Sequence, residues 1–171
     1  MFKGLAIILI FSSCTLVGMF SSSQLQRRKK LLLDFQDFLQ KLETEMGYFK
    51  KPLPEMFQKF HQNSNLPLDI LLRQCLWTLE RTDSSVQEAW RAAIYSAYEN
   101  EPLKPADLAV LCKCGDFLGQ SDYLGQKGYF VLLKQELSRQ IQEATDFCKT
   151  KGTLYNKAGI SIGAVLAIAL L

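Results

Sequence analysis

The feature that most constrains this chain is an uncharged, apolar stretch near its start, residues 4–20, which is followed by four clustered basic residues. The stretch is dominated by Leu, Ile, Phe and Val. It approaches the roughly 20 apolar residues that a helix needs to cross a bilayer. Basic residues beside a membrane helix are retained on the cytoplasmic side. The basic cluster consists of Arg27, Arg28, Lys29 and Lys30. It predicts that the following residues are held on the cytoplasmic face of the membrane. Membrane orientation alone accounts for the presence of this cluster.

A second uncharged segment, residues 158–171, closes the sequence. It is short, but counted from Leu154 and Tyr155 it reaches the lower limit of about 17 residues for a span. Three lysines precede the uncharged segment, again on the side of the body: Lys149, Lys151 and Lys157. We therefore predict a two-pass membrane protein with both termini on the far side. Its expected parts are an N-terminal transmembrane helix (residues 1–23), a cytosolic body (24–152) and a C-terminal transmembrane helix (153–171).

Small residues in both apolar segments predict helix packing within the membrane. Gly159 and Gly163 form a GxxxG motif that Ala167 extends, and Cys14 with Gly18 makes a weaker pair in the first segment. Such spacing lets two helix backbones approach closely in lipid. Glycine is also frequent in membrane helices without any packing role, and that alternative stays open.

An apolar run after Lys3 is also typical of a secretory signal. Residues 11–14 end in Cys14 and loosely match a lipoprotein cleavage site, so an exported lipoprotein lipidated at Cys14 is an alternative. The apolar run continues through Leu16, Val17 and Phe20, which favours an uncleaved anchor.

The body between the apolar ends shows helical periodicity and no sustained alternation of strand type. Apolar residues recur three and four apart in a helix from residue 24 that can continue from the first apolar segment and that Pro52 and Pro54 end. Further helices are expected at residues 55–61, from Pro67 to about 79, at 86–97, from Pro105 onward, and as one long helix up to Cys148. The expected fold class is all-α, an antiparallel helical bundle.

Local signals place several helix ends. Ser85 with Glu88 three residues later is a capping-box pattern. Pro67 is suited to the first position of a helix. Ser121 or Asp122 is expected to cap the long last helix.

Glycines give two further predictions. Gly115 and Gly119 are candidate breaks at the end of the helix that starts near Pro105. Gly125 and Gly128 would be costly in an isolated helix, which predicts a close neighbouring helix.

The sequence offers little catalytic chemistry. His61 is the only histidine and has no companion that would make it a base in a triad. No Gly-rich phosphate loop is present, and a net charge of +3 does not favour nucleic acid. Glu43 and Glu45 are two residues apart, hence on different sides of a helix, and are expected to be solvated or to face a partner. We therefore predict no enzyme, no cofactor and no nucleic-acid partner.

The five cysteines fit no disulfide framework and favour a reducing compartment: Cys14, Cys75, Cys112, Cys114 and Cys148. Cys112 and Cys114 resemble a metal site most, but their spacing is not that of zinc ligands. A tethered metal or redox protein that uses these two residues with Cys75 and Cys148 is a second alternative.

Three stretches of the chain resemble the stage III sporulation protein AB family of endospore-forming bacteria. The first stretch contains Leu42, Glu43, Thr44, Glu45, Met46 and Tyr48, then Pro52, Leu53, Pro54 and Glu55. The second contains Leu118, Gly119, Gln120, Ser121 and Asp122 with Gln126 and Lys127, and the third runs from Leu154 and Tyr155 to Ala158 and Gly159. The matches are collinear and span nearly the whole chain. Lys50 and Lys51 depart from the smaller residues that the family tends to carry.

The resemblance implies a mother-cell membrane protein, in the membrane that faces the forespore, within a secretion-like channel that sporulation requires. Its cytosolic helices are similar to those of type II secretion F platform proteins. The implied role is a scaffold that couples a stage III sporulation protein AA-like ATPase to other channel membrane proteins. The resemblance gives Glu43, Glu45, Tyr48, Pro52, Pro54, Glu55, Gly119, Ser121, Asp122 and Gln126 as a possible partner surface. A homo-oligomer is left open.

Overall fold

The computed structural model describes residues 2–49, 52–62, 64–118 and 123–152, together with 154, 158 and 161. Side chains of residues 2–11, 14, 48, 49 and 123–127 lie outside this description. The helices are α1 (Phe2–Phe49), α2 (Leu53–His61), α3 (Leu68–Arg81), α4 (Val86–Ala97), α5 (Pro105–Leu118) and α6 (Tyr123–Phe147). A short π-helical turn, Cys148–Gly152, follows α6. No strand occurs among the described residues, so the predicted all-helical class is confirmed.

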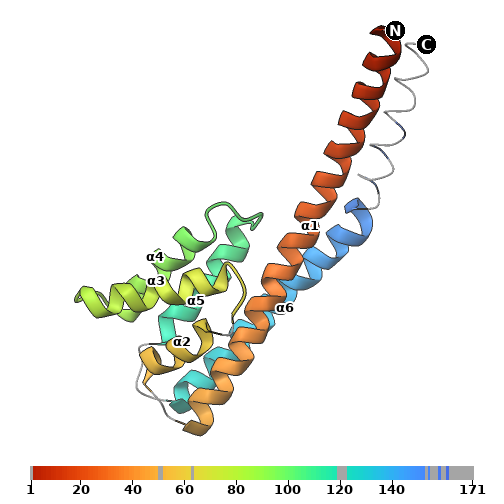
Figure 1. Ribbon diagram of the computed structural model, residues 1–171. Coiled ribbons are helices and arrows are strands. Elements are labelled where there is room, and N and C mark those ends of the chain that lie inside the picture. The colour runs from red at the N-terminus through yellow and green to blue at the C-terminus, as the bar shows by residue number, and fades with distance from the viewer. Residues whose placement is uncertain are drawn as a thin grey trace. The chain divides into compact units, whose positions relative to one another are not determined.

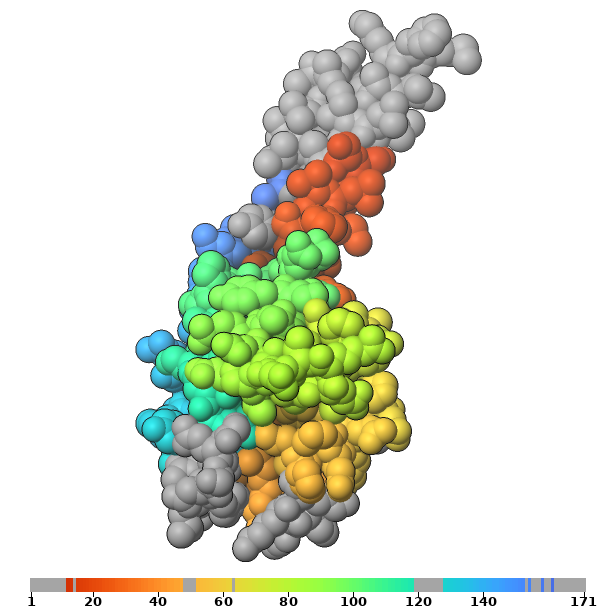
Figure 2. Space-filling view, turned by 90° about the vertical axis from the view of Figure 1, so that its left-hand side faces the viewer, coloured from red at the N-terminus to blue at the C-terminus, as the bar shows by residue number. Residues whose placement is uncertain are grey.

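The chain divides into two compact units, Leu31–Gln140 and a second unit made of Met1–Lys30 with Ile141–Leu171. In the Leu31–Gln140 unit, α1 and α6 run antiparallel (Figure 1). Two pairs fix this direction: Gln36 hydrogen-bonds Ser138, and Glu43 pairs with Lys134, so numbers rise on α1 as they fall on α6. Each of α2 to α5 packs against its neighbour in sequence. Figure 2 shows α3 and α4 on the surface of this unit.

The observed starts of α2, α3 and α4 lie at or within two residues of the predicted ones. Ser85 Oγ accepts a hydrogen bond from the Glu88 backbone N–H, and the Glu88 carboxylate accepts one from the Ser85 N–H, which confirms the capping box before α4. Helix α2 begins one residue before Pro54, and Pro67 occupies the N-cap of α3, one position before the first helical residue.

Helix α5 starts with a cap that the sequence analysis missed. Asp107, in its first turn, is fully buried, and its carboxylate accepts a hydrogen bond from the Lys104 N–H at 2.8 Å. An acidic side chain that satisfies an N–H group at the start of a helix also interacts favourably with the helix dipole.

The core of the Leu31–Gln140 unit is built around Trp90 on α4, which is fully buried. Its indole stacks on Phe38 of α1 and contacts Phe57 of α2, with ring centroids 6.0 and 5.7 Å away. The indole N–H donates to the Leu111 carbonyl oxygen at 3.0 Å, which satisfies the one polar group of the side chain. One residue thus joins α1, α2, α4 and α5.

Gly115 explains why α5 can approach Trp90. The predicted helix break at Gly115 is wrong: the residue is buried inside α5, which continues to Leu118. A Cβ atom at this position would lie 2.7 Å from Trp90 Cδ1, closer than real Cβ contacts. The glycine therefore makes room for the indole and does not end the helix.

Gly128 shows the opposite environment. A Cβ atom there would meet nothing within 4 Å, so the described part of this chain supplies no close neighbour for this residue. Gly119 and the predicted caps Ser121 and Asp122 lie outside the described residues. Gly125 lies in the part of α6 whose side chains are outside the description.

The second unit contains the first part of α1 and the end of α6. Arg28, from the basic cluster, is almost completely buried, and its guanidinium lies 3.8 Å from the Glu143 carboxylate. The prediction that membrane orientation alone accounts for the basic cluster is therefore wrong for Arg28, which also packs inside this unit. No helix in the part of the chain that was described is both long and apolar enough to cross a bilayer. Most of the predicted C-terminal span lies outside the described residues, and both spans stay predictions.

Candidate functional site

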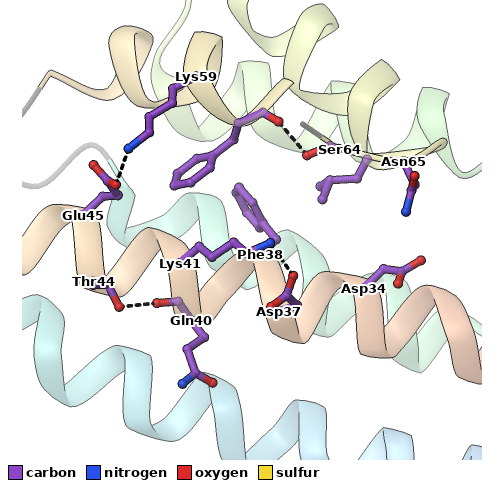
Figure 3. Close-up of a pocket in the computed structure, with 12 residues that line it drawn as sticks. Asp34, Asp37, Phe38, Gln40, Lys41, Thr44, Glu45, Lys59, Ser64 and Asn65 are labelled. Carbon is purple, nitrogen blue, oxygen red and sulfur yellow. Dashed lines mark hydrogen bonds and ion pairs between the residues drawn. The ribbon is translucent and has the colours of Figure 1, made fainter. Parts of the chain in front are cut away.

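A groove of about 470 Å³ lies along α1, beneath α2 and the connection to α3 (Figure 3). We call it the α1/α2 groove. Its lining residues come from one face of α1, from the end of α2 and from the start of α3: Asp34, Asp37, Phe38, Gln40, Lys41, Thr44, Glu45, Lys59, Phe60, Ser64, Asn65 and Leu68. The helical spacing of the α1 residues places acidic and basic side chains on the same face as Phe38.

Two ion pairs lie along the groove. Lys41 binds Asp37 one turn earlier on α1, with Nζ 2.6 Å from the carboxylate oxygen, and both side chains are mostly exposed. Lys59 of α2 reaches Glu45 of α1 at 2.5 Å, and the Glu45 side chain is only 14% exposed. Exposed pairs contribute little to stability, whereas a partly buried carboxylate depends more on its partner. Of the two ion pairs, only Lys59–Glu45 joins α2 to α1.

The apolar part of the groove continues into the core. The Phe38 and Phe60 rings meet edge to face with centroids 5.8 Å apart. Phe38 also stacks on Trp90, as described above. The apolar wall of the groove is therefore continuous with the aromatic core around Trp90.

The connection between α2 and α3 is held by a small charge cluster beside the groove. His61 Nδ1 lies 2.6 Å from one Asp69 carboxylate oxygen, and Arg73 approaches the other oxygen at 3.3 Å. His61 therefore has a carboxylate neighbour that the sequence did not reveal. The nearby Ser64 hydroxyl donates to the Phe60 carbonyl oxygen, so its proton is directed at the backbone and not at the imidazole. The observed contacts join two helices and do not form a nucleophile–base pair.

Glu43 and Glu45 project to different sides of α1, as their spacing predicts. Glu43 pairs with Lys134 of α6 at 2.6 Å, and its side chain is 22% exposed. Glu45 pairs with Lys59 of α2 on the other side. Both carboxylates hold neighbouring helices of the same chain and are largely buried, so the expectation that they are solvated is wrong, while the expectation that they face a partner stays a prediction. Only Glu45 also lines the groove.

The other predicted residues are spread over the described and undescribed parts of the chain. Pro52 is the N-cap of α2, while Pro54 and Glu55 are exposed in its first turn, at the corner after α1. Gly18 is buried on α1. Outside the described residues or side chains are Tyr48, Gly119, Ser121, Asp122, Gln126, Gly159, Gly163 and Ala167. Of the described residues in the first matched stretch, only Thr44 and Glu45 line the groove. Most residues of the other two stretches lie outside the described part of the chain.

The cysteines of the Leu31–Gln140 unit are buried thiols. Burial raises the pKa of Cys75 to about 12. Burial also raises the pKa of Cys114 well above its usual value, and the neighbouring Cys75 raises it further. Burial likewise raises the pKa of Cys112. Thiolate, the form that binds metal and reacts, is therefore disfavoured at all three. Among the described residues, no three His, Cys, Asp or Glu side chains are placed to hold a metal. The Cys14 side chain lies outside the described ones.

The sequence analysis missed the groove as a site. Asp37 and Lys41 carry a local signal, because opposite charges four residues apart pair on a helix. No local sequence signal marks Lys59, Phe60 and Ser64 as groove residues. They reach the groove only because α2 and the connection after it turn back over α1.

Fold and site together define an all-helical protein with a charged groove on the face of its longest helix. The model of a family described as Stage III sporulation protein AB matches residues 3–171. A curated relative, Stage III sporulation protein AB of Bacillus subtilis (strain 168), is 22% identical over 171 residues, the whole of both chains. A solved structure of Stage III sporulation protein AB has a TM-score of 0.66 at 23% identity, over 71% of this chain and 96% of that one.

The chain belongs to the stage III sporulation protein AB family. The resemblance found in the three sequence stretches is thereby confirmed, and the family implies a role in sporulation. The solved relative shares the helical fold.

Proposed function

We propose that this protein is a non-enzymatic membrane platform in the secretion-like channel between mother cell and forespore. The observation that carries the proposal is the family match over residues 3–171. The apolar segments at both ends and the basic residues beside them support a two-pass anchor in the mother-cell membrane, with the helical body on the cytoplasmic side. In this role the body couples a stage III sporulation protein AA-like ATPase to other membrane proteins of the channel.

The α1/α2 groove is the surface that we assign to the ATPase. Three carboxylates and two lysines line it, and the lysines are bound to Asp37 and Glu45. Asp34 therefore gives the groove an excess of negative charge beside the Phe38 and Phe60 rings. This combination suits a partner segment that presents basic and apolar side chains. Contact there would act on Phe38 and hence on the Trp90 core.

Gene deletion with complementation tests the sporulation role. Deleting the gene in the spore former that carries it is expected to stop forespore development after engulfment, and the unsubstituted gene restores heat-resistant spores. Normal development without the gene would contradict the proposal.

The same assay tests the groove through a matched pair of variants. Asp34→Arg inverts the charge in the groove, whereas Asp83→Arg makes the same change at an exposed position in the α3–α4 connection. We expect at least a tenfold loss of heat-resistant spores with Asp34→Arg and none with Asp83→Arg, at equal protein levels. Equal spore counts would remove the groove from the proposal and leave the platform role standing.

A further inference from the structure

A second hollow, of about 310 Å³, lies between α5 and α6. Phe117 and Leu133 form its nearly buried floor, while Tyr129 and Leu132 of α6 stand beside it, 52% and 58% exposed. We call these four residues the α5/α6 face. Tyr129 and Leu132 together form an exposed apolar ridge. The Tyr129 ring stacks on Phe117, nearly parallel, with centroids 6.3 Å apart, which gives the Tyr129 side chain a defined position next to the hollow. An ordered apolar ridge that stays exposed is typical of an interaction surface.

Gly128 gives this face a second, independent feature. It precedes Tyr129 and lies one helical turn before Leu132, hence on the same side of α6. Glycine inside a helix costs about 1 kcal/mol relative to alanine. Within the described part of this chain nothing approaches the position to explain that cost. A glycine on a helix surface does allow the backbone of another helix to come close, which points to a helix from outside this chain.

The charges around the face say what kind of partner fits. Lys113 pairs with Glu136 at 2.6 Å across the hollow. Asp116 lies 3.8 Å from the Arg91 guanidinium and accepts a hydrogen bond from Gln87 at 2.6 Å. The rim therefore presents both signs in balance, and a strongly charged partner would gain little from it. The fitting partner is a neutral, apolar helix surface that itself carries both signs at its rim.

The α5/α6 face meets that description itself, since it carries a ridge and a hollow side by side. Two copies related by a twofold axis can each insert the ridge into the hollow of the other, because a twofold interface uses the same surface twice. We propose that the α5/α6 face is a homodimer contact in which Tyr129 and Leu132 of each copy enter the other's hollow. The two α6 helices cross at Gly128.

The size of the face predicts a weak contact. A stable interface covers roughly 800 Å² per partner, more than a few side chains supply. Confinement of both copies to one membrane would raise their effective concentration and favour pairing. The dimer does not depend on ATPase binding at the α1/α2 groove, which lies on other residues, so either proposal can fail alone.

Disulfide trapping in the full chain tests the crossing point. Gly128→Cys places a thiol where the helices are proposed to cross, within reach of its own copy in the partner. Ile70→Cys is the control, because Ile70 is 37% exposed on α3, away from the face. In membranes treated with a mild oxidant, we expect at least tenfold more disulfide-linked dimer from Gly128→Cys than from Ile70→Cys or the unsubstituted chain. Equal yields would overturn the proposal, as would crosslinks formed only to a different protein.

A charge substitution tests the ridge without requiring a crosslink. Leu132→Glu leaves the core untouched because Leu132 is exposed, but it brings two carboxylates into apolar hollows in the dimer. In membranes, energy transfer between two labelled populations of the full chain should show at least a tenfold weaker dimer for Leu132→Glu and no change for Ile70→Glu. Unchanged melting temperatures would show that both variants are folded. An equal effect of the two variants, or no effect of Leu132→Glu, would refute the contact.

Discussion

The contact between Gly115 and Trp90 allows one substitution to be worked out in detail. A methyl group added by Gly115→Ala would lie 2.7 Å from Trp90 Cδ1 and 2.9 Å from its Cβ and Cγ. The indole cannot turn away easily, because Trp90 is fully buried, packed against Phe38 and Phe57, and hydrogen-bonded to Leu111. Helix α5 must therefore move away from α4, or the indole must leave its position.

The magnitude follows from two opposing effects. Inserting an extra carbon into a packed core costs roughly 1–3 kcal/mol. Replacing glycine by alanine inside a helix returns up to about 1 kcal/mol. We therefore expect Gly115→Ala to lower the free energy of unfolding by about 1–2 kcal/mol. Gly128→Ala makes the same chemical change on α6 in open space among the described residues, so it should raise stability by up to about 1 kcal/mol.

Thermal unfolding of the full chain in detergent, followed by circular dichroism at low protein concentration, measures both variants. Changes of this size correspond to several degrees in melting temperature for a domain of this length. The result that refutes the reasoning is a Gly115→Ala protein that melts at or above the temperature of the unsubstituted chain. Opposite shifts of the two variants would show that the contact, and not the residue type, decides the sign.

Three other predictions concern the capping box, an ion pair and the buried thiols. Ser85→Ala should cost about 1 kcal/mol in urea unfolding, because it removes the acceptor for an N–H group of α4. A double-mutant cycle with Glu43→Gln and Lys134→Met should give a coupling of about 0.5–1 kcal/mol, since the pair is only partly buried. With the folded-state pKa of Cys75 raised from 9.0 to about 12, the unfolded chain loses this proton first as the pH rises, so stability should fall between pH 9 and 12. Cys75→Ala should flatten that fall in melting temperature, and an unchanged slope would show that the thiol does not contribute.

The sequence predicted those features that depend on neighbours along the helix. Periodicity was sufficient for the all-helical class, and Ser85 with Glu88 identified the start of α4 because a capping box is complete within four residues. The spacing of Glu43 and Glu45 correctly placed them on different sides of α1.

Features that depend on tertiary contacts were not predictable in this way. The sequence pattern predicts a helix end at Gly115 because a local pattern cannot distinguish a C-cap from a glycine on which another side chain packs. The pairing of His61 with Asp69 depends on the path of the connection between α2 and α3. The α1/α2 groove exists only because α2 turns back over α1, which places Lys59 beside Glu45.

Copurification with the ATPase-like protein tests the central claim, that this chain couples a cytosolic ATPase to the membrane, most directly. The full chain would be isolated from sporulating cell membranes as the unsubstituted protein, as Asp34→Arg and as Asp83→Arg, and the bound stage III sporulation protein AA-like ATPase would be quantified. We predict that the ATPase accompanies the unsubstituted chain and Asp83→Arg, and falls at least tenfold with Asp34→Arg. Absence of the ATPase from the unsubstituted preparation, under conditions that keep the membrane complex intact, would contradict the account.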